Sequence, residues 1–117
     1  MRGMISFAVT LVAILAMAAN AYAQGEGIRG NSAAGKQLYE SKGCYSCHGY
    51  VGQGSREGPR IAPAMPLPAF VVQLRTPRAI MPPYTETLLS EQQVVDIHAF
   101  LDSLPKPPDP KTIRLLQ

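Results

Sequence analysis

The sequence has few of the residues from which disulfide frameworks and metal clusters are built. It contains only two cysteines, Cys44 and Cys47, and two histidines, His48 and His98. A structural zinc site usually takes four ligands from paired clusters, and His98 stands alone in a later segment. A disulfide between such close cysteines would close a small strained loop, and a thioredoxin-like pair needs a βαβ setting that is lacking. All three are weaker alternatives for the thiols.

Charge and catalytic motifs are equally sparse. The chain has 11 Lys and Arg against 8 Asp and Glu, a formal net charge of +3, and no block of like charges. So small an excess does not argue for nucleic-acid binding, and we expect none. No serine, histidine and acid set occurs at recognisable spacing, and no phosphate-cradling glycine motif follows a strand. We therefore expect a protein that is not an enzyme.

What the sequence does contain is the pentad Cys44-Tyr45-Ser46-Cys47-His48. C-x-x-C-H is the attachment signature of covalently bound haem c. Two thiols three residues apart lie on the same side of one helical turn, where they can form thioethers to the two vinyl groups of a porphyrin. The histidine that follows is then placed beneath the iron as its proximal ligand. The pentad therefore predicts one covalent haem c, held by Cys44 and Cys47 and ligated by His48.

The amino terminus predicts export. Arg2 precedes an apolar run over 4–19, and an A-x-A ending follows at Ala21-Tyr22-Ala23. This pattern is typical of a secretory signal peptide over residues 1–23, cleaved after Ala23. Haem c is attached outside the cytoplasm, so we expect a periplasmic protein without a membrane anchor after cleavage. The alternative is an uncleaved anchor, because residues 4–23 are about long enough to span a bilayer.

Removal of 23 residues from 117 leaves 94, enough for one small domain. The pattern predicts a flexible Gly-rich arm over 24–32, a domain over 33–104 and a Pro-rich tail over 105–117. The same pattern contains helical periodicity and no strand alternation.

Three longer helices are predicted within this domain. The first covers 33–41 with Ser32 as its cap, the second covers 69–75 with Pro68 in its first turn, and the third covers 91–104. The third begins with a capping box formed by Ser90 and Gln93. Its apolar residues recur at helical spacing, with Phe100 beside them: Val94, Ile97, Leu101 and Leu104.

At this point the chain resembles the class I, mono-haem bacterial cytochromes c. The resemblance covers about 33–104 and is carried, in the family's order, by the pentad, Gly58-Pro59-Arg60-Ile61, Met81-Pro82-Pro83-Tyr84 and the terminal helix. It implies an all-α, small cytochrome c fold, with three to four helices wrapped around one covalently bound haem c. It also implies that the first and last helices cross near Gly35, against residues such as Ile97 and Phe100. In such a fold Pro59 offers its carbonyl to the free ring nitrogen of His48.

The second axial ligand decides the function. We expect Met81, because two prolines restrict its backbone, and a thioether raises the reduction potential by favouring ferrous iron. Met65, which also precedes a proline, is the rival ligand, and the alternative role of either methionine is flexible packing against the porphyrin. His98 is expected at the surface or in packing. With His48 and Met81 both bound, the iron can only exchange electrons. An open sixth position would instead make a haem enzyme or a ligand sensor.

The resulting expectation is a periplasmic one-electron carrier, either a soluble shuttle or the cytochrome subunit of a dehydrogenase. Its partners would be redox proteins, namely a dehydrogenase or a terminal oxidase or reductase. Basic residues near the haem-bearing segments could steer docking or form an ordinary solvated surface: Lys42, Arg56, Arg60, Arg75 and Arg78. Arg60 or Arg78 could instead bind a haem propionate. The tail is expected to pack back on the domain or to dock on a partner.

Overall fold

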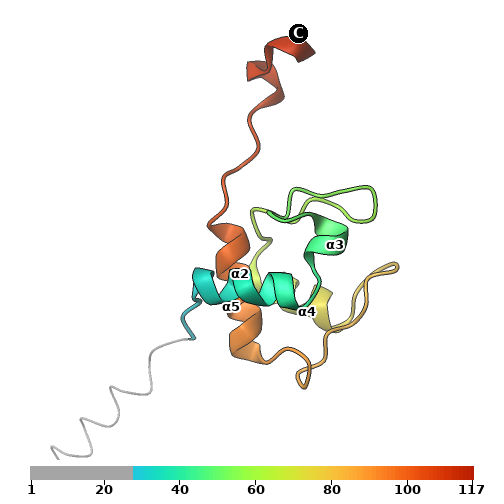
Figure 1. Ribbon diagram of the computed structural model, residues 1–117, viewed down its shortest axis with the longest axis vertical. Coiled ribbons are helices and arrows are strands. Elements are labelled where there is room, and N and C mark those ends of the chain that lie inside the picture. Colours follow the sequence, from blue (N-terminus) through green and yellow to red (C-terminus); the bar gives the residue numbers. More distant parts are fainter. Residues whose placement is uncertain (1–27) are drawn as a thin grey trace, which may run out of the picture.

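The computed structural model describes residues 28–117, so the signal peptide expected over 1–23 lies outside the described residues. The described chain is all-α, as predicted, with four α-helices, two short 3-10 helices and no strand within 28–117 (Figure 1). The α-helices are α2 (Ser32–Ser41), α3 (Tyr45–His48), α4 (Leu67–Arg75) and α5 (Glu91–Asp102). The 3-10 helices are η1 (Pro110–Thr112) and η2 (Arg114–Leu116).

The start of α2 differs from the prediction by one residue. Asn31 is the cap, because its side chain accepts a hydrogen bond from the Ala34 N–H at 3.0 Å. Ser32 is the first helical residue, and its hydroxyl lies 3.0 Å from that of Ser103. Asparagine and serine are about equally good caps. The capping propensities of the two residues therefore could not decide which of them caps α2.

The last residues of the arm are bound to α5, unlike the loose segment expected over 24–32. The Arg29 carbonyl accepts a hydrogen bond from Gln92 Nε2 at 2.9 Å. The Asn31 N–H donates to Asp96 Oδ1 at 2.8 Å, and Gln92 Nε2 donates to the same carboxylate oxygen at 2.8 Å. Asp96 is the buried charged residue of the described core, and these donors compensate its burial.

Helices α2 and α5 cross at a glycine and make the most extensive contact between the described helices (Figure 1). A Cβ on Gly35 would overlap the Asp96 carbonyl oxygen and lie 3.0 Å from the Ile97 backbone nitrogen. Only a residue without a side chain lets the two backbones approach this closely. The crossing expected at Gly35 is therefore present, and Phe100 packs beside it against Tyr39 at 5.5 Å between ring centroids.

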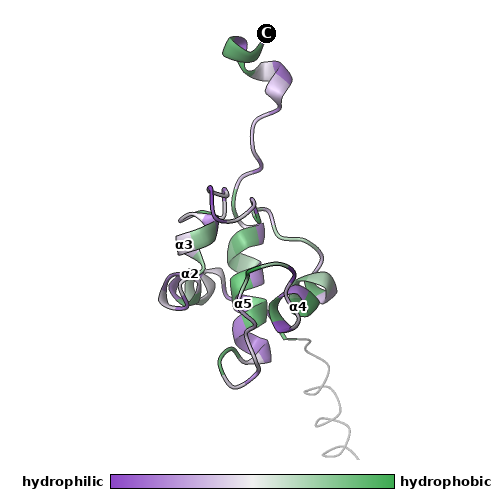
Figure 2. Cartoon of the chain, turned by 90° about the vertical axis from the view of Figure 1, so that its right-hand side faces the viewer, coloured by the Kyte–Doolittle hydropathy of each residue, from purple (hydrophilic) through white to green (hydrophobic). Residues whose placement is uncertain are grey.

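The core forms around the apolar face of α5, which lies between α2 and α4 in Figure 2. The predicted stripe is buried at Val94, Ile97, Phe100 and Leu101, whereas Leu104 lies beyond the helix end and is half-buried. The capping box at Ser90 and Gln93 is formed as predicted. Helix α4 begins at Leu67, with Pro68 in its first turn, and buries residues Phe70 and Leu74 against the same core.

The C-terminal tail extends away from the helices in both views (Figures 1 and 2). The side chain of Leu115 is 94% exposed and that of Leu116 is 67% exposed, so in this structure neither packs back on the domain. Asp109 caps η1 by accepting a hydrogen bond from the Lys111 N–H at 2.9 Å. Within residues 28–117 no helix combines the length and apolarity needed to cross a membrane.

Candidate haem-binding site

A cavity of about 470 Å³ lies beside the core and gathers residues from distant parts of the chain. Its walls come from α3, α4 and α5, from the loop over 57–65 and from the segment over 78–84. Apolar side chains such as Phe70, Leu74 and Ile97 form much of the lining. The residues expected at the site all line this one cavity: Cys44, Cys47, His48, Pro59 and Met81.

The pentad folds as one helical turn at the edge of this cavity. Cys44 precedes the first residue of α3, and its carbonyl accepts a hydrogen bond from the His48 N–H at 3.0 Å. Both cysteines are half-buried, and no disulfide joins them. Burial raises the pKa of the Cys44 thiol. The two sulfurs therefore stand on the cavity side of one turn, as covalent attachment to a single porphyrin requires.

Two phenols, the buried Tyr39 and the half-buried Tyr84, flank the Cys44 side of the cavity. Burial, followed by the nearby Cys44 thiol, raises the pKa of Tyr39 to about 12, and its hydroxyl donates to the Gly49 carbonyl at 2.7 Å. Burial, followed by the nearby Cys44 thiol, also raises the pKa of Tyr84 to about 12. Both groups are neutral hydrogen-bond donors at neutral pH. Neither sequence position had been assigned to the site.

The imidazole of His48 makes one hydrogen bond within the described residues. Its Nδ1–H donates to the Pro59 carbonyl at 2.8 Å, the contact that the family resemblance implied. Because a carbonyl only accepts, Nδ1 carries the proton and Nε2 is the nitrogen left with a free lone pair for a metal. The carbonyl also increases the basicity of the ring as a ligand.

Gly58 makes this contact possible by its lack of a side chain. A Cβ at Gly58 would lie 3.1 Å from both Cε1 and Nδ1 of His48 and 2.9 Å from the Cys47 carbonyl oxygen. The backbone therefore passes directly against the imidazole and carries the Pro59 carbonyl with it. The Gly58-Pro59 pair is a weak motif in the sequence, and its role in positioning the Pro59 carbonyl becomes visible only in this packing.

The loop after the pentad is tied to the same turn. The Ser55 hydroxyl donates to the Cys47 carbonyl at 2.6 Å, and the Gly54 N–H donates to the His48 carbonyl at 2.8 Å. Carbonyls at the end of a helix lack partners within it, so these donors complete the attachment turn. Ser55 carries no signal in the sequence that could have identified it.

Both candidate methionines line the cavity, and His98 does not. Met81 is half-buried against the core, whereas Met65 is 39% exposed. His98 donates from Nε2 to the Met65 carbonyl at 2.8 Å and stands edge-on to Phe70. It thus anchors the loop that carries Met65, in the packing role expected of it.

The segment that carries Met81 is held at Tyr84. The Tyr84 N–H donates to the Leu74 carbonyl at 2.8 Å, and its hydroxyl donates to the Lys42 carbonyl at 3.0 Å. Arg75 Nη1 donates to the carbonyls of Tyr84 at 2.6 Å and Leu89 at 2.8 Å. This guanidinium is therefore engaged within the fold and does not belong to a docking patch.

The other arginines near the site are arranged differently. Arg60 and Arg78 are exposed and both line the cavity, where a cation is available for an acidic group of a ligand. Arg60 also donates from Nη1 to the Ala62 carbonyl at 3.0 Å.

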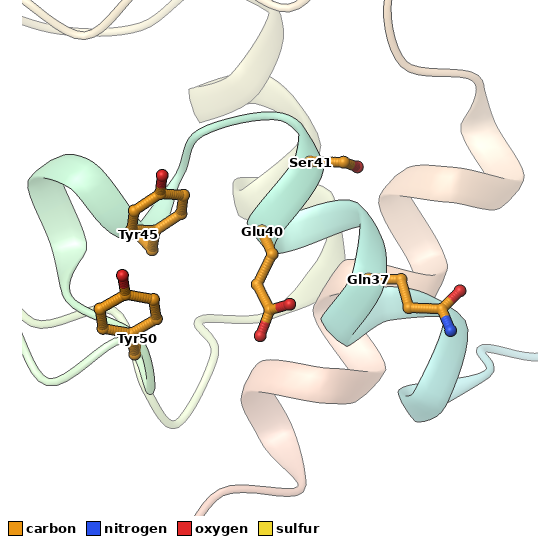
Figure 3. A pocket seen from close by; sticks show the side chains of 5 residues that line it. All are labelled: Gln37, Glu40, Ser41, Tyr45 and Tyr50. Carbon is orange, nitrogen blue, oxygen red and sulfur yellow. The ribbon is translucent and has the colours of Figure 1, made fainter.

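A second depression lies between α2 and the segment over 45–50, whose lining side chains Figure 3 shows. Its most prominent feature is the stacked pair Tyr45 and Tyr50, with ring centroids 4.8 Å apart. Glu40 from α2 points toward the same hollow. The depression shares no lining residue with the cavity, so it is not a second wall of the haem-binding site.

These features fit a covalent porphyrin: a mostly apolar cavity, two thiols on one turn, and an imidazole with Nε2 free. The chain also matches the family model described as Cytochrome C oxidase, cbb3-type, subunit III over residues 30–101. The chain belongs to this family. The match agrees with the resemblance to mono-haem cytochromes c and with the predicted cofactor, covalently bound haem c. Such a domain transfers electrons through its haem. No curated protein and no solved structure matches the chain.

Proposed function

We propose that this protein carries one electron at a time on a haem c whose iron is ligated by His48 and Met81. The haem iron supplies the one-electron chemistry, and the chain supplies two axial ligands, two thioether attachments and an apolar enclosure. The contact between His48 Nδ1 and the Pro59 carbonyl at 2.8 Å carries the proposal, because it presents Nε2 as a ligand. Met81 is the better second ligand because it is half-buried and lies on an anchored segment.

Compartment and partners are further parts of the proposal. An export signal over 1–23 would place the mature chain in the periplasm, where haem c is attached. There it would serve as a soluble shuttle or as the cytochrome subunit of a larger redox complex. The matched family is described as a subunit of the cbb3-type cytochrome c oxidase, which supports a terminal oxidase as the proposed electron acceptor, and we propose a dehydrogenase as a further partner.

The ligand assignment is tested with two methionine variants of the exported holoprotein. Met81→Ala should remove the long-wavelength absorption of a thioether bound to ferric iron. It should also lower the reduction potential by on the order of 0.2 V, since axial ligands set haem potentials over a wide range. Met65→Ala is the matched control, because its side chain lines the same cavity, and it should keep both properties.

The opposite pattern, with Met65→Ala losing the absorption and Met81→Ala keeping it, would reverse the ligand assignment. A wild-type protein that is high-spin in the ferric state and binds cyanide or carbon monoxide without displacing a ligand would instead be an enzyme or sensor. Periplasmic fractionation with amino-terminal sequencing checks the compartment. The mature chain should begin at Gln24, and a membrane-bound chain that begins at Met1 would show an uncleaved anchor.

A further inference from the structure

Gln73 is a polar side chain in the largely apolar wall of the cavity. It lies on α4 between the buried residues Phe70 and Leu74, is half-buried and lines the cavity. Its Nε2 donates to the Met81 sulfur at 3.6 Å. Sulfur is larger than oxygen, so this distance is a normal contact for a thioether, which is a weak acceptor.

The contact is held from both sides. Phe70 and Leu74 fix α4 to the core, which limits the freedom of Gln73. On the other side, Tyr84 binds the Leu74 carbonyl with its N–H, and Arg75 binds the Tyr84 carbonyl. The donor and the sulfur therefore approach each other from two anchored elements. The other candidate ligand, Met65, has no hydrogen bond to its sulfur among the described residues.

On the basis of the proposed ligation by Met81, we infer that Gln73 is a positioning residue that tunes the reduction potential through the Met81 sulfur. A thioether sulfur has two lone pairs, and Gln73 engages one of them, which leaves the other for a metal. A donor on the first lone pair withdraws electron density from the sulfur. Ferric iron depends on that density more than ferrous iron does, so the contact favours the reduced state.

The test replaces the donor and keeps the ligand. Gln73→Leu has a similar size and no donor, and Gln73→Asn keeps an amide that is one methylene too short to reach the sulfur. Gln37→Leu is the matched control, because Gln37 is an exposed glutamine on α2 outside the cavity. Each holoprotein is titrated by absorbance to obtain its reduction potential, and the ferric thioether absorption is recorded.

Gln73→Leu and Gln73→Asn should each shift the ratio of oxidised to reduced protein about threefold toward the oxidised form at a fixed ambient potential. With a tenfold change equal to 59 mV for one electron, this is a fall of about 28 mV. The ferric absorption should persist and move to longer wavelength, because the sulfur then gives up charge more easily. Gln37→Leu should change neither property.

Several results would overturn the inference. A Gln73→Leu potential equal to that of Gln37→Leu would show that the contact does not tune the iron. An unchanged potential in Gln73→Asn alone would assign the effect to cavity polarity. Loss of the absorption in Gln73→Leu would show that Gln73 is needed for ligation itself. In each case a wild-type absorption that is lost in Met81→Ala would still support Met81 ligation, whereas its absence from the wild type would refute the proposed function.

Discussion

Replacement of Gly58 by alanine tests how the backbone sets the strength of the His48 ligand. The new Cβ would lie 2.9 Å from the Cys47 carbonyl oxygen and 3.1 Å from Nδ1 and Cε1 of His48. Ordinary carbon contacts begin several tenths of an ångström further out. The Cys47 carbonyl belongs to the attachment turn, and in the proposed holoprotein His48 would also be held by the iron, so we expect the loop that carries Gly58 to be the part that moves.

That movement acts directly on the neighbouring Pro59. A loop displaced by a few tenths of an ångström lengthens the 2.8 Å contact between His48 Nδ1 and the Pro59 carbonyl. A hydrogen bond of this kind is worth about 1 kcal/mol net, and we expect about half of it to be lost. The carbonyl makes the imidazole more basic and so favours ferric iron. Its weakening should raise the reduction potential by about 20 mV.

The assay is a spectroscopic redox titration of the Gly58→Ala holoprotein beside Val51→Ala. Val51 lies in the same loop with a 50% exposed side chain, so its truncation should leave the potential unchanged. A Gly58→Ala potential that is lower than that of wild type, or equal to it, would refute the reasoning. The sign is informative because loss of the Gln73 donor is expected to move the potential the other way.

Two further predictions concern the fold. Gly35→Ala should lower the free energy of unfolding by about 2–3 kcal/mol in urea, because the cost of the overlap between its Cβ and the Asp96 backbone exceeds the gain in helix propensity. Lys36→Ala, at an exposed neighbouring position, should change the free energy of unfolding by no more than about 0.5 kcal/mol. A Gly35→Ala protein as stable as wild type would contradict the close crossing of α2 and α5. The raised pKa of Tyr39 means that its stabilising effect is full below its ordinary pKa of 10.0 and is lost as the pH rises through about 12. Tyr39→Phe should therefore show a smaller loss of stability between pH 10 and 12 in alkaline unfolding followed by circular dichroism, and an unchanged slope would exclude Tyr39 as the titrating group.

Features that depend on neighbouring residues could be predicted from the sequence. The capping box needs only Ser90 and Gln93, three residues apart, and it is formed as expected. The attachment pentad likewise encodes its own helical turn. Gly35 was placed by family resemblance, since a glycine within a helical pattern has no local signature of a crossing.

The misplaced or missed features depend on contacts between distant segments. Asn31, and not Ser32, caps α2. The N–H of Asn31 also donates to Asp96, which lies 65 residues further along the chain. The end of helix α5 is a local exception: it was expected at 104 and lies at Asp102, because Leu104 precedes Pro105 and is thereby disfavoured in a helical conformation.

The polar contacts at the candidate site were missed for the same reason. Gln73 and Ser55 are ordinary polar residues until the fold brings them to the Met81 sulfur and the Cys47 carbonyl. Arg75 was grouped with surface cations because its charge alone is visible in the sequence. Its actual partners are two carbonyls that belong to the loop before α5.

The anchoring of Tyr84 has a consequence for local opening of the chain. One residue joins α4, through its N–H to Leu74, to the turn before the pentad, through its hydroxyl to the Lys42 carbonyl. Local unfolding of the segment over 81–84 must therefore break both of these hydrogen bonds at once. Amide hydrogen exchange should report a single cooperative unit, in which the Tyr84 amide exchanges with the same opening free energy as the amides of the attachment turn.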